Sequence, residues 1–180
     1  MKSISTSLIT VISVILSSCS PEMVPFTTDI EHETGLNKEQ LQNVQFYVSG
    51  PIILYRELNN NITQVTRGEI KMTNDKQVEQ IVIPPNTPGV VVTGNAERLG
   101  VSFEKGSDRY LVFGKNPRQS NAYTLLAKNW KNNEGIVDYD GQEFKINTAS
   151  ASTYLVVDMK RFKDLKVSSR TAKGRAVGKL

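Results

Sequence analysis

Few side chains in this sequence could do covalent or acid–base chemistry, because its 180 residues include one cysteine, Cys19, and one histidine, His32. A Ser-His-Asp site would need His32 in a folded cleft, and a zinc site would need more His or Cys ligands than the sequence contains. Chemistry by carboxylates remains possible, because glycoside hydrolysis needs only two carboxylate side chains. The acids that fall among the expected strands and turns include Glu69, Glu97, Glu104, Asp108 and Asp138. Any soluble domain has that many acids, so they permit a hydrolase without predicting one.

Cys19 stands directly behind an apolar stretch, residues 8 to 16, which follows a charged start at Lys2. This order is typical of an export signal, and the stretch is shorter than the ~20 residues of a transmembrane helix. The sequence Leu16-Ser17-Ser18-Cys19 resembles the lipobox of bacterial lipoproteins. The resemblance implies that residues 1 to 18 are removed, that the Cys19 sulfur receives diacylglycerol, and that the freed amine is usually acylated. The alternative is a buried cysteine that happens to follow a signal.

The resemblance also implies a place in the cell envelope. Several acyl chains, at ~0.8 kcal/mol per buried methylene, hold a protein on a bilayer more firmly than one chain does. A thiol converted to a thioether takes no part in disulfide exchange, which suits a lone cysteine in an oxidising compartment. Ser20, in place of aspartate, points to the outer rather than the inner membrane. The membrane, reached through the lipid on Cys19, is therefore the first expected partner.

Residues 19 to 35 are expected to form a flexible tether, because they contain two prolines and show no sustained hydrophobic period. The folded domain is expected to begin at Leu36. Asn37 is placed as an N-cap, Gln40 completes a capping box, and Leu36 and Leu41 occupy the two positions of a hydrophobic staple. The sequence therefore predicts a short helix at the start of the domain.

Beyond this helix the hydrophobic pattern alternates, which is typical of β-strands. Strands are expected at residues 44–48, 52–57, 78–83, 89–93, 99–103, 109–113, 123–127, 136–139, 143–146 and 153–158. Turn residues separate them at the spacing of all-β sandwiches and barrels, without long helical patterns between them. We expect one all-β domain, residues 36 to 167, a sandwich or barrel-like fold of about eight to ten short, mainly antiparallel strands.

One hairpin can be assigned in register from its turn. The dipeptide Asp140-Gly141 suits a type I′ turn, in which both central residues need positive φ. This register sets Asp138 opposite Glu143 on one face of the hairpin. Two facing carboxylates can mark a calcium site or an acid pair. The favoured interpretation is that both lie in water near Lys145.

Trp130, Lys128 and Lys131 are the candidate residues for contact with a partner. An indole between two cations at the end of a strand can stack on a sugar ring or an aromatic group. A tryptophan in such a place more often closes the core, and the core is the favoured interpretation.

The end of the chain is expected to hold a short helix and a tail. Asp158 can cap a helix in which Met159, Phe162 and Leu165 form an apolar stripe. Residues 168 to 180 carry four basic residues and no acid, with few apolar groups, and are expected to be a basic disordered tail. Such a tail can meet an anionic surface of lipid, polysaccharide or protein. A solvated end without a partner is the favoured interpretation.

Two functional classes fit these observations. The preferred class is a non-catalytic module on the envelope membrane that binds or scaffolds an envelope protein or glycan. The other class is a carboxylate-dependent hydrolase of cell-wall or imported glycan, which two carboxylates ~5 to 10 Å apart in one cleft would favour. For the preferred class we expect no catalytic residue, no metal ion, no cofactor and no nucleic-acid partner.

We predict that Cys19→Ala abolishes labelling of the protein by a fatty-acid analogue and leaves the signal uncut, because lipidation needs the thiol. Metabolic labelling and the mass of the product measure both effects. Ser18→Ala, which keeps a small residue before the cysteine, is the matched control and should be labelled normally. Continued labelling of Cys19→Ala would contradict the lipobox interpretation.

Overall fold

The computed structural model of the chain describes residues 21–58, 68–73 and 76–167. Cys19, the expected signal and the expected tail at residues 168 to 180 lie outside these described residues. Within them the chain is mostly β-strand, arranged in antiparallel sheets with a few short helices. The predicted all-β fold class is therefore confirmed.

The described strands form two sheets. The seven-stranded sheet has the order β1 (Met23–Pro25), β13 (Leu155–Asp158), β2 (Gln45–Val48), β6 (Pro88–Asn95), β7 (Arg98–Ser102), β8 (Tyr110–Asn116) and β9 (Ala122–Leu125). The six-stranded sheet has the order β10 (Asn129–Lys131), β11 (Glu134–Tyr139), β12 (Gln142–Asn147), β3 (Ile52–Leu58), β5 (Lys76–Ile83) and β4 (Glu69–Thr73). The helices are α1 (Thr28–Thr34), α2 (Lys38–Leu41), the 3-10 helix η1 (Pro117–Gln119), α3 (Thr148–Ala151) and α4 (Met159–Val167).

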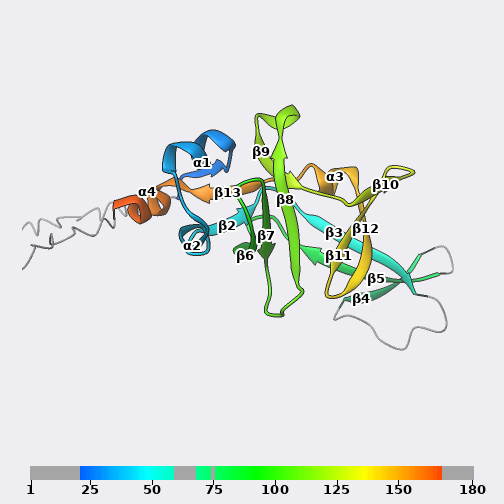
Figure 1. Cartoon of the computed structure of the whole chain (residues 1–180). Coiled ribbons are helices and arrows are strands. Elements are labelled where there is room, and N and C mark those ends of the chain that lie inside the picture. The colour runs from blue at the N-terminus through cyan, green and yellow to red at the C-terminus, as the bar shows by residue number, and fades with distance from the viewer. Residues whose placement is uncertain (1–20, 59–67, 74–75, 168–180) are drawn as a thin grey trace, which may run out of the picture.

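The two sheets share one hydrophobic core in a sandwich-like arrangement. Alternate side chains of each strand turn inward, as in β2, where Phe46 and Val48 are fully buried. Ile52 and Leu54 continue this buried row into β3 after the turn at residues 49 to 51. The path from β2 to β3 therefore carries the core from the seven-stranded sheet into the six-stranded sheet (Figure 1).

The turn between β11 and β12 has the predicted register. Asp140 and Gly141 have φ of 52° and 71°, as a type I′ turn requires, and Asp138 lies opposite Glu143. Arg109, just before β8, holds the turn from the other sheet, with its Nε and Nη2 3.0 and 2.8 Å from Asp140 Oδ2. The hydrogen bond to Asp140 raises the pKa of the Arg109 guanidinium. The turn is thus tied to both sheets.

The two end helices that the sequence predicts are present. In α2, Gln40 N donates to Asn37 Oδ1 at 2.9 Å and Asn37 N donates to Gln40 Oε1 at 3.0 Å, which completes the capping box. At the start of α4, Lys160 N donates to Asp158 Oδ1 at 3.1 Å. Phe162 of α4 is 3% exposed and belongs to the core. Capping residues therefore located both helices correctly.

The domain begins before Leu36, so the tether expected at residues 19 to 35 is wrong for its described part. β1 pairs with β13, Phe26 is fully buried, and α1 follows with Thr27 as its N-cap. A β-strand makes its backbone hydrogen bonds with a neighbouring strand and not within itself. Its partner β13 supplies them from the far end of the chain, and for that reason the local sequence gave no sign of the strand.

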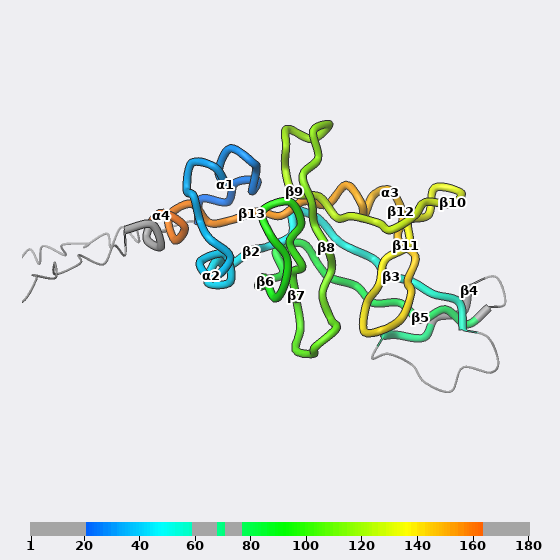
Figure 2. Tube along the Cα trace, viewed as in Figure 1, coloured from blue at the N-terminus to red at the C-terminus, as the bar shows by residue number. Residues whose placement is uncertain are grey.

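The molecule is elongated, with different elements at its two ends. α4 lies at one end, next to α1 and α2, whereas β10 and the β4–β5 pair lie at the other (Figures 1 and 2). Among the residues that the structure describes, no helix is both long enough and apolar enough to cross a membrane.

We predict that Phe26→Ala lowers the free energy of unfolding by ~3 to 5 kcal/mol, because it opens a cavity beneath β1. Urea unfolding measures the change. Glu22→Ala is the control: it alters an exposed side chain in the same segment and should change stability by less than about 0.5 kcal/mol. Equal stability of the two variants would restore the tether interpretation.

Candidate functional site

A cavity of about 540 Å³ opens on the outer side of β7 and β8, where β11 of the other sheet meets them. We call it the charged cavity. Four charged side chains line it together with apolar ones, and its lining is Arg98, Asp108, Tyr110, Val112, Leu126, Ala127, Lys128, Val137, Asp138 and Gly141. The charges come from four separate segments, so the junction of the two sheets creates the site.

Two glycines lie beneath residues that line the charged cavity. A Cβ on Gly100 would lie 2.9 Å from Tyr110 Cδ2, and a Cβ on Gly114 would lie 2.5 Å from Leu126 Cδ1. Tyr110 and Leu126 therefore lie directly over bare backbone, on the face of the sheet opposite the core. Tyr110 and Arg98 were not predicted as site residues. The alternation of strand 109–113 was a usable signal, because it places Tyr110 on the opposite face from Leu111.

Lys128 bridges the two facing carboxylates of the hairpin. Its Nζ lies 2.6 Å from Asp138 Oδ1 and 3.4 Å from Glu143 Oε1. The hydrogen bond to Asp138 raises the pKa of the Lys128 ammonium. Both acids are exposed, as expected, but Lys145 does not screen them and instead lies 3.1 Å from Glu134 Oε2. Asp138 and Glu143 thus form an ion-paired group with Lys128.

A second hollow, of about 620 Å³, lies on the other side of the segment from Leu125 to Trp130. We call it the tryptophan groove; Leu126 and Ala127 line both it and the charged cavity. Its other lining residues include η1, Lys115, Asn116, Thr124, Thr148, Ala151 and Ser152. The indole shares the apolar part of the lining with Pro117, Leu125, Leu126, Ala127 and Ala151.

Trp130 is 46% exposed, so the interpretation that placed it in the core is wrong. It lies opposite Gly135 in the β10–β11 pair, and a Cβ on Gly135 would come within 3.2 Å of Trp130 Cζ2. Gly135 is buried and pairs with the core residue Ile146, so the indole lies on the core-facing side of the sheet, at its exposed margin. The three predicted contact residues are separated, since Lys128 lines the charged cavity, Trp130 lines the groove, and Lys131 lines neither.

The acids considered for hydrolysis are also separated. Asp108 and Asp138 line the charged cavity together. Glu104 accepts a hydrogen bond from Tyr139 Oη at 2.7 Å, and Glu69 lies on the edge strand β4. Within the described residues, no group of three or more His, Cys, Asp or Glu side chains is placed to hold a metal ion.

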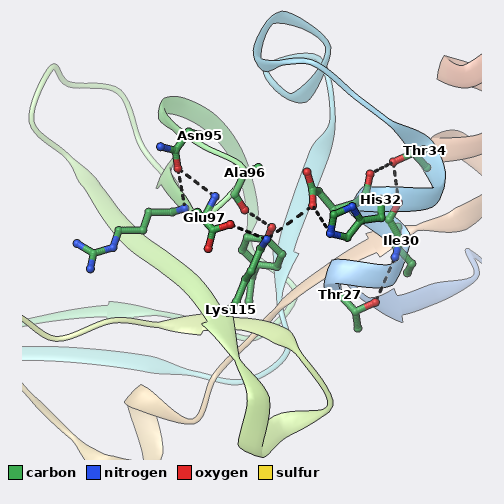
Figure 3. Close-up of polar contacts among 11 residues, drawn as sticks. Thr27, Ile30, His32, Thr34, Asn95, Ala96, Glu97 and Lys115 are labelled. Atoms are coloured by element: carbon green, nitrogen blue, oxygen red, sulfur yellow. Dashed lines mark hydrogen bonds and ion pairs between the residues drawn. The ribbon is translucent and has the colours of Figure 1, made fainter.

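Lys115 lies at the centre of a polar cluster that joins α1 to β8 and to the β6–β7 turn (Figure 3). Its Nζ lies 2.9 Å from Glu97 Oε1 and 3.9 Å from Glu31 Oε2. The Glu31 side chain is 11% exposed, and its Oε2 accepts no hydrogen bond from the described residues. Tyr123 Oη donates to Ala96 O beside this cluster. The Lys115 ammonium therefore compensates a nearly buried carboxylate and holds α1 in place.

The candidate histidine belongs to the edge of the same cluster. His32 Nε2 lies 4.0 Å from Glu31 Oε2, and 76% of the His32 side chain is exposed.

Burial, together with the carboxylates of Glu31 and Glu97, raises the pKa of Tyr123. Tyr123 therefore keeps its proton at neutral pH and stays a hydrogen-bond donor.

The six-stranded sheet contains two further polar pairs. Arg56 Nε lies 2.6 Å from Oε2 of Glu79, whose side chain is fully buried. Tyr55 Oη donates to Glu134 Oε1 at 2.7 Å, and burial and this contact raise the pKa of Tyr55 to about 12. The first pair joins the neighbouring strands β3 and β5, and the second joins β3 to β11 across β12, which indicates a structural role.

We predict that Lys115→Met lowers the free energy of unfolding by roughly 1 to 3 kcal/mol, because it leaves the Glu31 carboxylate without its cation. Adding Glu31→Gln should recover part of the loss, which a double-mutant cycle by urea unfolding measures. Lys131→Met, at the exposed end of β10, is the control and should change little. If Glu31→Gln deepened the loss, the pairing would be contradicted.

No known protein family, curated protein or solved structure matches this chain. The charged cavity and the tryptophan groove are therefore interpreted from their own side chains.

Proposed function

We propose that the protein is a membrane-anchored lipoprotein of the bacterial cell envelope whose β-rich domain binds an envelope glycan or protein without catalysis. The lipobox sequence at Cys19 supports the anchor, and Ser20 favours the outer membrane. The folded domain starts at β1, only a few residues after Cys19. A lipid at Cys19 would thus hold the whole domain at the membrane surface.

The charged cavity is the observation that carries the binding function. It combines an aromatic side chain, Tyr110, with cations and carboxylates at one opening. A ligand site of this kind can stack an apolar ring face and exchange hydrogen bonds with hydroxyl or charged groups. Its volume, about 540 Å³, lies within the range of small-molecule and sugar sites. The exposed indole of the tryptophan groove adds a second surface suited to a ring face.

The alternative function is a carboxylate-dependent glycan hydrolase, which the shared cavity of Asp108 and Asp138 favours. A general acid must hold a proton at neutral pH. Asp138 instead accepts a hydrogen bond from the Lys128 ammonium at 2.6 Å. This ion pair is better suited to recognising polar groups than to donating a proton, so binding is the preferred function.

We predict that Arg98→Ala weakens binding of an envelope component roughly tenfold or more, because a hydrogen bond to a charged group contributes about 1.5 to 3 kcal/mol. Full-length protein would be immobilised and exposed separately to the glycan and the protein fractions of detergent-solubilised envelopes, with bound material identified by mass spectrometry. Lys131→Ala removes an exposed cation outside both hollows and is the matched control. Identical capture by all three proteins would contradict a role for the charged cavity.

The same fractions distinguish the two functions. If the protein binds without catalysis, incubation with envelope glycan releases no new reducing ends, and Asp108→Asn and Asp138→Asn behave as the unaltered protein does. Release of reducing ends by the unaltered protein, lost in both variants, would establish the hydrolase instead.

A further inference from the structure

The tryptophan groove lies between η1, which follows β8, and α3. Gln119 Nε2 of η1 donates a hydrogen bond to the backbone oxygen of Ser152, directly after α3, at 3.0 Å. Leu125 N of β9 donates to Thr153 O, one residue further along, at 3.1 Å. Hydrogen bonds from both η1 and β9 to the end of α3 therefore hold the groove in shape.

Trp130 offers an open aromatic surface in this groove. Its Cζ2 lies 3.2 Å from the place of a Cβ on Gly135, so one part of the indole rests against the backbone of β11. The residue is nevertheless 46% exposed. An indole that is supported on one part and open on the rest is suited to stacking on the apolar face of a sugar ring.

Neutral polar side chains share the lining with the indole. Asn116, Gln119, Thr148 and Ser152 carry amide or hydroxyl groups. Such groups both donate and accept hydrogen bonds, as sugar hydroxyls do. The lining therefore suits a ligand in which hydroxyl groups surround an apolar ring face.

Arg118 provides a positive charge in the groove. The residue is exposed, and its backbone N donates to Asn116 Oδ1 at 3.0 Å. Its guanidinium makes no hydrogen bond or ion pair with the part of the chain that the structure describes. The other cation of the lining, Lys115, is already paired with Glu97 and Glu31. Arg118 is therefore the cation that a ligand in the groove can use.

No carboxylate lines the tryptophan groove among the described residues. The nearby helix α1, which meets the β8–β9 turn, carries Asp29, Glu31 and Glu33. Glu31 turns to Lys115, and the other two lie outside the lining. Glu134 alternates with Gly135 along β11, so it lies on the opposite face of the sheet from the indole. The guanidinium in the groove is thus open to an anionic group.

We infer that the tryptophan groove binds an acidic glycan, with the Trp130 indole against one sugar ring and the Arg118 guanidinium on a carboxylate or phosphate of the same glycan. Guanidinium groups pair with both kinds of anion through two parallel hydrogen bonds. This inference rests on the proposed function, which names an envelope glycan as one class of ligand. It assigns that ligand to the groove and makes the groove selective for acidic over neutral glycans.

Tryptophan fluorescence tests the inference, because Trp130 is the only tryptophan and its emission reports on the groove alone. The glycan fraction of detergent-solubilised envelopes is separated by anion exchange into an acidic and a neutral pool. Each pool is titrated into the full-length protein, and the emission shift and the acrylamide quenching of Trp130 are measured. Amidation of the carboxylates in one sample, and removal of the phosphates with hydrofluoric acid in another, identify the anion that Arg118 binds.

The acidic pool should shift the emission and protect Trp130 from acrylamide, with an affinity roughly tenfold higher than that of the neutral pool. Arg118→Gln, which keeps a polar side chain without the charge, should remove this preference. Lys131→Gln removes an exposed cation next to Trp130 but outside the groove. It is the matched control and should behave as the unaltered protein does. Unchanged unfolding midpoints confirm that both variants fold.

Equal responses to the two pools, or an unchanged preference in Arg118→Gln, would overturn the inference. Glycan capture that Arg98→Ala abolishes, without any change in Trp130 emission, would assign the glycan to the charged cavity and leave the proposed function intact. Capture of envelope protein without glycan would likewise overturn only the inference. Capture of neither fraction would overturn the proposed binding function and the inference with it.

Discussion

Phe26 joins the two edges of the seven-stranded sheet. Its N donates to Leu155 O in β13 at 2.8 Å, and its O accepts from Tyr123 N in β9 at 3.1 Å. Its fully buried ring lies 5.1 Å from the ring of Phe46 and 4.9 Å from that of Tyr123. The first strand, the last strand and the edge strand β9 therefore depend on one side chain and its two backbone groups. Edge strands covered in this way are protected from pairing with other chains.

The strands that could be predicted are those with strong local signals. Asp140-Gly141 fixed a hairpin register because only a few residue pairs tolerate two positive φ angles. Asn37 and Gln40 located α2 because they cap each other. β1 escaped prediction because it is short, contains proline and becomes a strand only through β13. β4 and β10 escaped for a similar reason, since each is an edge strand whose partner supplies its order.

The candidate site was less accessible to sequence reasoning than the fold. Lys128, Trp130 and Asp138 could be selected by residue type, but alternation along one strand cannot tell which sheet will cover it. Trp130 was assigned to the core for that reason, whereas it lies at the open margin of the core-facing side, over Gly135, and stays 46% exposed. The charged cavity could not be predicted, because it depends on how β11 packs against β8. Only the folded chain brings these two segments together.

The charged cavity and the tryptophan groove share one wall, the segment that holds Leu126 and Ala127. Leu126 and Ala127 present one side to each. A ligand that shifts this wall in one hollow changes the shape of the other, and the coupling free energy acts equally in both directions. A substitution at Leu126 or Ala127 therefore alters the lining of both hollows at once.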